Sequence, residues 1–75
     1  MMTISNLTET EREVYIELKS ILKLNRRPFY GMGLMIANNI GTSKNVVCQT
    51  LGRLCDYELV IKVGRGKYEL IEVSQ

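Results

Sequence analysis

The spacing of the apolar residues changes once along this 75-residue chain, near residue 58, and that change limits the folds open to it. Up to residue 57 the apolar residues recur at intervals of three and four, as on one face of an α-helix. From residue 59 they form a short branched run and then alternate with polar residues, as in β-strands. The chain is therefore expected to be mainly α-helical with a C-terminal β-hairpin, which is a small α+β fold.

The first helix is predicted over residues 8–24. Thr8 and Glu11 have the spacing of a capping box, in which each side chain accepts a hydrogen bond from the other residue's amide. The acidic first turn of this helix suits the positive end of the helix dipole. The four glutamates of the helix are interpreted as a solvated surface with no catalytic role. Its core-facing stripe consists of Val14, Leu18, Ile21 and Leu22.

Two further helices are predicted, over residues 32–40 and 43–57. Pro28 ends the first helical segment, and Gly41 suits the left-handed conformation that closes a helix and turns the chain. Thr42 and Ser43 are the candidate N-caps of the third helix. The predicted core stripe of that helix consists of Val47, Leu51, Leu54 and Glu58. Its outward face is small and polar, with Asn45, Gln49, Gly52 and Asp56.

The tail, residues 59–73, is predicted to be a β-hairpin that turns at Gly64-Arg65-Gly66. Its tip, from Lys62 to Lys67, carries three cations and no acidic residue. Such a tip suits contact with a phosphate backbone, and the alternative is a simple solvated turn.

The length of the chain allows one core, so residues 1–75 are expected to form a single domain. Residues 1–6 precede the first helix and are free to order on a partner or to stay flexible. Domains this small bury only about 60% of their unfolded surface and commonly gain support from a disulfide, a metal or self-association. A homodimer is expected here.

The chain has no histidine and two cysteines, Cys48 and Cys55, which is too few soft ligands for a zinc site. It also lacks the commonest general base, so neither an enzyme nor a metal or other cofactor is expected. Seven residues of helix place the two cysteines about 10 Å apart, too far for an intrachain disulfide. They are interpreted as half-buried residues at the core margin, with an interchain disulfide or a redox switch as alternatives.

Positive charge is concentrated in the later two-thirds of the chain. The net charge is only +2, but residues 1–24 carry −1 and residues 26–67 carry +5. A polyanion is expected to meet this later part. No run approaches the roughly 18 apolar residues of a membrane helix, and the N-terminus lacks the pattern of a signal peptide. A cytoplasmic protein that does not enter membranes is expected.

The order of these features resembles the winged helix-turn-helix DNA-binding family. The pattern runs Ile36-Ala37-x-x-Ile40-Gly41-x-Ser43-x-x-x-Val47-x-x-x-Leu51-x-x-Leu54, continued by Leu59-Val60 and Gly64-Arg65-Gly66-x-Tyr68-x-Leu70. The opening, with Leu7-Thr8, Glu13-Val14 and a basic residue and Pro before the second helix, is similar to the DNA-binding domains of SOS-response repressors. The resemblance covers residues 7–71. It is confined to DNA binding and implies nothing about the self-cleaving activity of the SOS-response repressors.

Two positions depart from the pattern of the family. Thr42 follows the turn glycine where the family usually has an apolar residue, and Glu58 ends the third helix where the family usually has glycine. The turn after the second helix, and the path of the chain from the third helix into the hairpin, are therefore expected to differ from those of the family.

The resemblance implies that the helix over residues 43–57 enters the major groove as the recognition helix and that the hairpin is the wing. Asn45 and Gln49 would read bases, while Lys44 and Arg53 would reach guanine or phosphate. The remaining contacts expected in the recognition helix are Thr42 and Ser43. Phosphate or minor-groove contacts are expected from Lys62, Arg65 and Lys67 in the wing, and further backbone contacts from Arg26, Arg27 and Tyr30.

The leading hypothesis is a sequence-specific binder of double-stranded DNA that regulates transcription, as a repressor of the plasmid, phage or virus type. A homodimer is expected because one small module reads too few base pairs to select a genomic site. One alternative is a winged-helix protein-interaction module that docks on a transcription or replication protein, which Asp56, Glu58 and the modest charge favour. Another is a replication or partition protein that uses the same DNA contacts.

Overall fold

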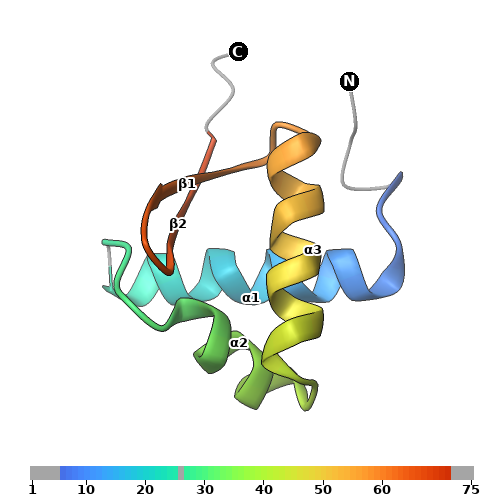
Figure 1. Cartoon of the computed structure of the whole chain (residues 1–75), viewed down its shortest axis with the longest axis horizontal. Coiled ribbons are helices and arrows are strands. Elements are labelled where there is room, and N and C mark those ends of the chain that lie inside the picture. Colours follow the sequence, from blue (N-terminus) through green and yellow to red (C-terminus); the bar gives the residue numbers. More distant parts are fainter. Residues whose placement is uncertain (1–5, 26, 72–75) are drawn as a thin grey trace.

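Three α-helices are followed by a two-stranded antiparallel hairpin in the computed structural model, which describes residues 6–25 and 27–71 (Figure 1). This arrangement confirms the small α+β fold with three helices and a C-terminal hairpin. The elements are α1 Glu9–Asn25, α2 Met32–Ile40, α3 Lys44–Asp56, β1 Val60–Gly64 and β2 Lys67–Leu70. The predictions for residues 1–5, for Arg26 and for the last residues of the tail fall outside the described residues.

α1 begins with the predicted capping box. The Thr8 amide donates to Glu11 Oε1 at 3.0 Å, and the Glu11 amide donates to Thr8 Oγ1 at 3.2 Å. Both bonds occupy amides that a helix start would otherwise leave without a partner. The capping box is therefore confirmed, and it stabilises the first turn of α1, in which Glu11 lies.

The turn between α2 and α3 is closed by Gly41, as predicted. Gly41 has a φ of 75°, and the amides of Gly41 and Thr42 both donate to the Ala37 carbonyl at 2.9 Å. Ser43 is the N-cap of α3, because its Oγ accepts a hydrogen bond from the Val46 amide at 3.2 Å. Of the two candidate caps, Ser43 serves this role.

The end of α3 corrects one prediction, since Glu58 is exposed and does not belong to the core stripe. α3 ends at Asp56, and Glu58 takes a left-handed conformation with a φ of 63°. The Leu59 amide donates to the Leu54 carbonyl and the Glu58 amide to the Cys55 carbonyl, both at 3.0 Å. These two bonds form a Schellman motif, which normally has glycine at the left-handed position. The helical spacing on which the predicted core stripe depends therefore does not extend to Glu58.

The core lies where α3 runs across α1, with α2 and the hairpin closing its sides (Figure 1). The hairpin contributes Val60 and Tyr68 to it. Within residues 6–25 and 27–71, no helix has the length and apolar character needed to span a bilayer. The fully buried side chains include Val14, Leu18, Met32, Ile36, Val47, Leu51, Leu54 and Val60.

The hairpin packs against the start of α2. Val60 pairs with Leu70 and Lys62 with Tyr68, and the register shifts by a bulge before Gly64 pairs with Lys67. The Tyr68 amide donates to Met32 Sδ at 3.4 Å. At the turn, the backbone of Gly66 lies so close to Tyr30 that an added Cβ would come within 3.3 Å of the Tyr30 ring. The strands therefore lie beside the first residue of α2, and the turn of the hairpin lies beside Tyr30.

Candidate nucleic-acid interface

A cleft of about 430 Å³ lies between the start of α2, the start of α3 and the hairpin. Three cationic side chains line it: Lys44 from α3, Lys62 from β1 and Arg65 from the turn between the strands. No acidic residue is among the residues that line the cleft. The other lining residues are Tyr30, Gly31, Gly33, Leu34, Cys48, Gly66 and Tyr68. The cleft therefore carries an uncompensated positive charge and attracts anions.

The fold brings together four of the residues predicted to contact DNA, although they come from distant parts of the chain. Tyr30, Lys44, Lys62 and Arg65 all line the cleft, and all four are exposed. Packing of the hairpin turn against Tyr30 is what brings Arg65 near the start of α3. Three cations converging on one opening can each contact a phosphate oxygen of a bound polyanion.

Asn45 and Gln49 lie on the exposed surface of α3, beside the cleft rather than within it. They are four residues apart, so their side chains are separated by about one helical turn. Each directly follows a residue that lines the cleft, Lys44 and Cys48 respectively. Gly52, one turn further along, faces open space, since a Cβ there would meet no atom within 4 Å. α3 thus presents two amide side chains next to the cationic cleft.

Thr42 and Ser43 are already engaged in local structure. The Thr42 amide is occupied by the Ala37 carbonyl, and the Thr42 side chain is half-buried. Ser43 is exposed, and because its Oγ acts as an acceptor in the N-cap bond, its hydroxyl proton remains able to donate. Of these two predicted phosphate contacts, Ser43 is the better placed.

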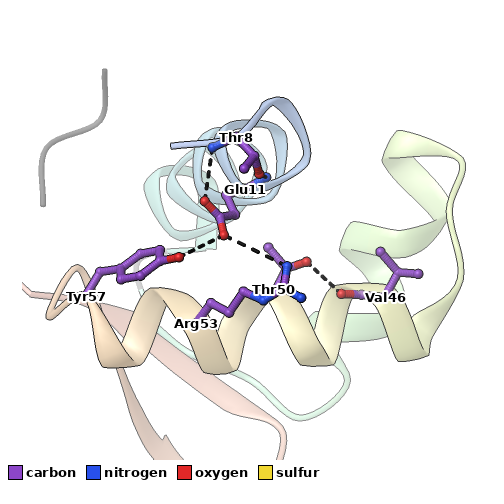
Figure 2. A network of polar contacts seen from close by, with 6 residues as sticks. All are labelled: Thr8, Glu11, Val46, Thr50, Arg53 and Tyr57. Carbon is purple, nitrogen blue, oxygen red and sulfur yellow. Dashed lines mark hydrogen bonds and ion pairs between the residues drawn. The ribbon is translucent and has the colours of Figure 1, made fainter. Parts of the chain in front are cut away.

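Arg53 points toward α1 and contacts a buried carboxylate (Figure 2). Its Nη1 lies 3.9 Å from Glu11 Oε2, and the Tyr57 hydroxyl donates to the same oxygen at 3.0 Å. The Glu11 side chain is only 3% exposed, whereas that of Arg53 is 59% exposed. Arg53 therefore keeps donors facing solvent while its positive charge lies beside Glu11.

The interpretation of the α1 glutamates as wholly solvated is wrong for Glu11. The Thr8 amide above all, and also the Tyr57 hydroxyl and Arg53, lower the pKa of Glu11 against an opposing effect of burial. The hydrogen bond to Glu11 raises the pKa of Tyr57. Glu11 precedes Leu18 by two helical turns and so shares its buried face, a signal from which the burial could have been predicted.

The other predicted basic contacts lie apart from the cleft or outside the described residues. Lys67 is exposed at the start of β2, and its side chain lies along Gly64, with Cδ 3.4 Å from where a Cβ of that glycine would be. Arg27 is exposed and does not line the cleft, and Arg26 is not among the described residues.

The two cysteines, both free thiols, differ in exposure, which corrects their common interpretation as half-buried. Cys55 is half-buried, and burial raises the pKa of its thiol, whereas Cys48 is exposed and lines the cleft. Sequence reasoning also missed Leu34 and Tyr68 as lining residues. Their place beside the cations depends on how the hairpin packs on α2, which no local pattern reveals.

Comparisons with known proteins found no matching family model, no matching curated protein and no matching solved structure.

Proposed function

We propose that this protein is a cytoplasmic, homodimeric transcriptional repressor of the winged helix-turn-helix class that binds specific sites on double-stranded DNA. The observation that carries the proposal is the convergence of Lys44, Lys62 and Arg65 on one cleft beside the exposed amides of α3. Sequence-specific binding requires cations that contact the phosphate backbone and, next to them, side chains that can pair with base edges.

In the proposed complex, α3 lies in the major groove. Asn45 and Gln49 carry amides that can pair bidentately with adenine, and Lys44 can reach guanine or phosphate. The hairpin then lies over the neighbouring backbone, where Lys62 and Arg65 contact phosphates. Arg53 exchanges its contact with Glu11 for a phosphate, or keeps it and contributes its exposed donors.

The size of the molecule limits how much DNA one copy can read. Its longest extent is 31 Å, which is close to one turn of DNA, roughly 34 Å. One copy can therefore place one α3 in one groove, and two copies are needed to read a site long enough to be selective.

The proposal is tested by selecting binding sites from a random pool of double-stranded DNA and measuring affinities for the selected and for scrambled duplexes. Arg65→Ala should weaken binding to both duplexes alike, because a phosphate contact carries no sequence information. Gln49→Ala should reduce the preference for the selected duplex. Lys19→Gln, which changes an exposed cation of α1, is the matched control and should change neither. Failure to enrich any sequence, or equal effects of both substitutions on both duplexes, would contradict base reading by α3.

A second candidate function, docking on a transcription or replication protein, is favoured by apolar residues exposed on the same helices. Leu34 on α2 is 51% exposed, and Val46 on α3 is 38% exposed. An apolar contact would respond little to salt, whereas phosphate contacts weaken steeply with it. The salt dependence of binding therefore separates the two functions.

A further inference from the structure

The cleft has the size and lining of a small-molecule site as well as the charge of a phosphate contact. Its volume of about 430 Å³ lies within the range of roughly 300–1,000 Å³ that is typical of ligand pockets. Ligand pockets of this kind combine an apolar lining with a few polar groups that orient the ligand. A cleft that met only a DNA strand would need the cations but not the apolar lining.

The apolar part of the lining comes from three elements. Leu34 of α2, Cys48 of α3 and Tyr68 of β2 all line the cleft. Tyr68 is 9% exposed, so only a small part of it is accessible, while Tyr30 is 69% exposed. Together these residues offer a flat apolar group the exposed Tyr30 ring, Leu34 and the accessible part of Tyr68 to pack against.

The charged side chains of the lining are all cationic. Lys44 and Lys62 can each place an ammonium group on an anion, and Arg65 can hold a carboxylate or phosphate through two parallel hydrogen bonds. No acidic lining residue opposes them. The lining as a whole is therefore complementary to a molecule with one anionic group and one flat apolar group.

We infer that this cleft binds a small organic anion that carries a flat apolar group. Such a ligand competes with DNA, because Lys44, Lys62 and Arg65 would serve both. The competition rests on the proposed function, whereas binding of the small molecule does not. The ligand would thus release the protein from its DNA site.

The direct test uses 1-anilinonaphthalene-8-sulfonate, a fluorescent aromatic anion, and its uncharged relative N-phenyl-1-naphthylamine. The sulfonate should bind the wild-type protein about tenfold more tightly than the uncharged compound, the change expected for one charge-assisted hydrogen bond. Lys44→Gln and Lys62→Gln should each weaken binding of the sulfonate and leave that of the uncharged compound unchanged. Lys19→Gln, a cation of α1 outside the cleft, should leave both unchanged.

The location of the bound probe is tested by alkylation of Cys48, which lines the cleft. Trypsin cleaves after Arg53 and so separates Cys48 from Cys55, which lets mass spectrometry follow both thiols in the wild-type protein. The sulfonate should slow the alkylation of Cys48 relative to that of Cys55. Equal binding of the two probes, no effect of Lys44→Gln and Lys62→Gln, or an unchanged rate at Cys48 would each overturn the inference.

Competition is measured with a labelled duplex and the same sulfonate. Displacement of the duplex over the concentration range in which the probe fluorescence saturates supports a shared site, and saturation without displacement overturns the competition. If no duplex binds at any salt concentration, the proposed function fails. The fluorescence and alkylation results still decide whether the cleft binds the anion.

Discussion

At the scale of single residues, Glu11 joins the start of α1 to the end of α3. Its two oxygens accept hydrogen bonds from the Thr8 amide and the Tyr57 hydroxyl, and Arg53 lies beside them. A buried carboxylate is tolerated only when its acceptors are filled in this way. Because the fold lowers the pKa of Glu11, the ionised side chain stabilises the fold more than the protonated one does.

This role predicts a dependence of stability on pH. Because the folded state lowers the pKa of Glu11, its contribution is present above the ordinary value of 4.5 and is lost as the pH falls through the lower, folded-state value. Glu11→Gln should lower the urea midpoint relative to wild type at about pH 7, and the difference should shrink at about pH 3. Glu13→Gln, at an exposed position of α1, is the control and should matter little. A difference that stays constant with pH would show that Glu11 acts without its charge.

Glu58 carries backbone strain at the end of α3. An L-residue in the left-handed conformation costs about 1–2 kcal/mol, and glycine avoids most of this cost. With a φ of 63° at this position, Glu58→Gly should raise the free energy of unfolding by about 1 kcal/mol. Glu58→Ala also removes the charge but keeps the Cβ, so it should not stabilise. A gain in the alanine variant equal to that in the glycine variant would assign the effect to charge.

At the scale of elements, the helices could be predicted because their signals are local. The Thr8–Glu11 box, the Gly41 turn and the Ser43 cap each involve residues within a few positions of one another, and all three form as predicted. The predicted core position of Glu58 is wrong because the helical spacing does not continue past the end of α3 at Asp56. A helical pattern does not indicate where the backbone leaves the helix when glycine is absent.

The candidate site could be predicted only in part. The exposed cations and amides follow from the outward face of α3 and from the hairpin composition. The cleft does not, because it forms when the turn at Gly66 packs on Tyr30, a contact between residues far apart in the sequence. The direction in which the Arg53 side chain points could not be predicted either, because it depends on the carboxylate of Glu11 in another helix.

The turn of the hairpin provides an element-scale prediction. Gly66 has a φ of 68° and no room beside Tyr30, whereas an added Cβ at Gly64 would meet mainly the flexible Lys67 side chain. Gly66→Ala should therefore lower the free energy of unfolding by about 1–2 kcal/mol, and Gly64→Ala should lower it less. Urea denaturation of the two variants measures this contrast. Equal losses would mean that the left-handed turn and its contact with Tyr30 do not determine how the hairpin packs.

At the scale of the whole molecule, the proposed dimer predicts the stoichiometry on DNA. A molecule whose longest extent is 31 Å covers about one turn of the duplex. Sedimentation of the protein with its selected duplex should therefore show two copies on each duplex, with the two half-sites about one helical turn apart. A saturated complex that contains a single copy would contradict the proposed dimer. One α3 would then have to read all the bases of the site.

The central claim is that Lys44, Lys62 and Arg65 form a contact surface for the phosphate backbone. It is tested most directly by fluorescence anisotropy of a labelled duplex across a salt series. The wild-type affinity should fall by about a hundredfold or more between roughly 50 and 200 mM salt. Each substitution removes one phosphate contact from each copy, so in the proposed dimer Lys44→Gln and Arg65→Ala should each reduce the magnitude of the salt slope by about two, and Lys19→Gln should not change it. An affinity that is insensitive to salt, or the same slope in all four proteins, would contradict the claim.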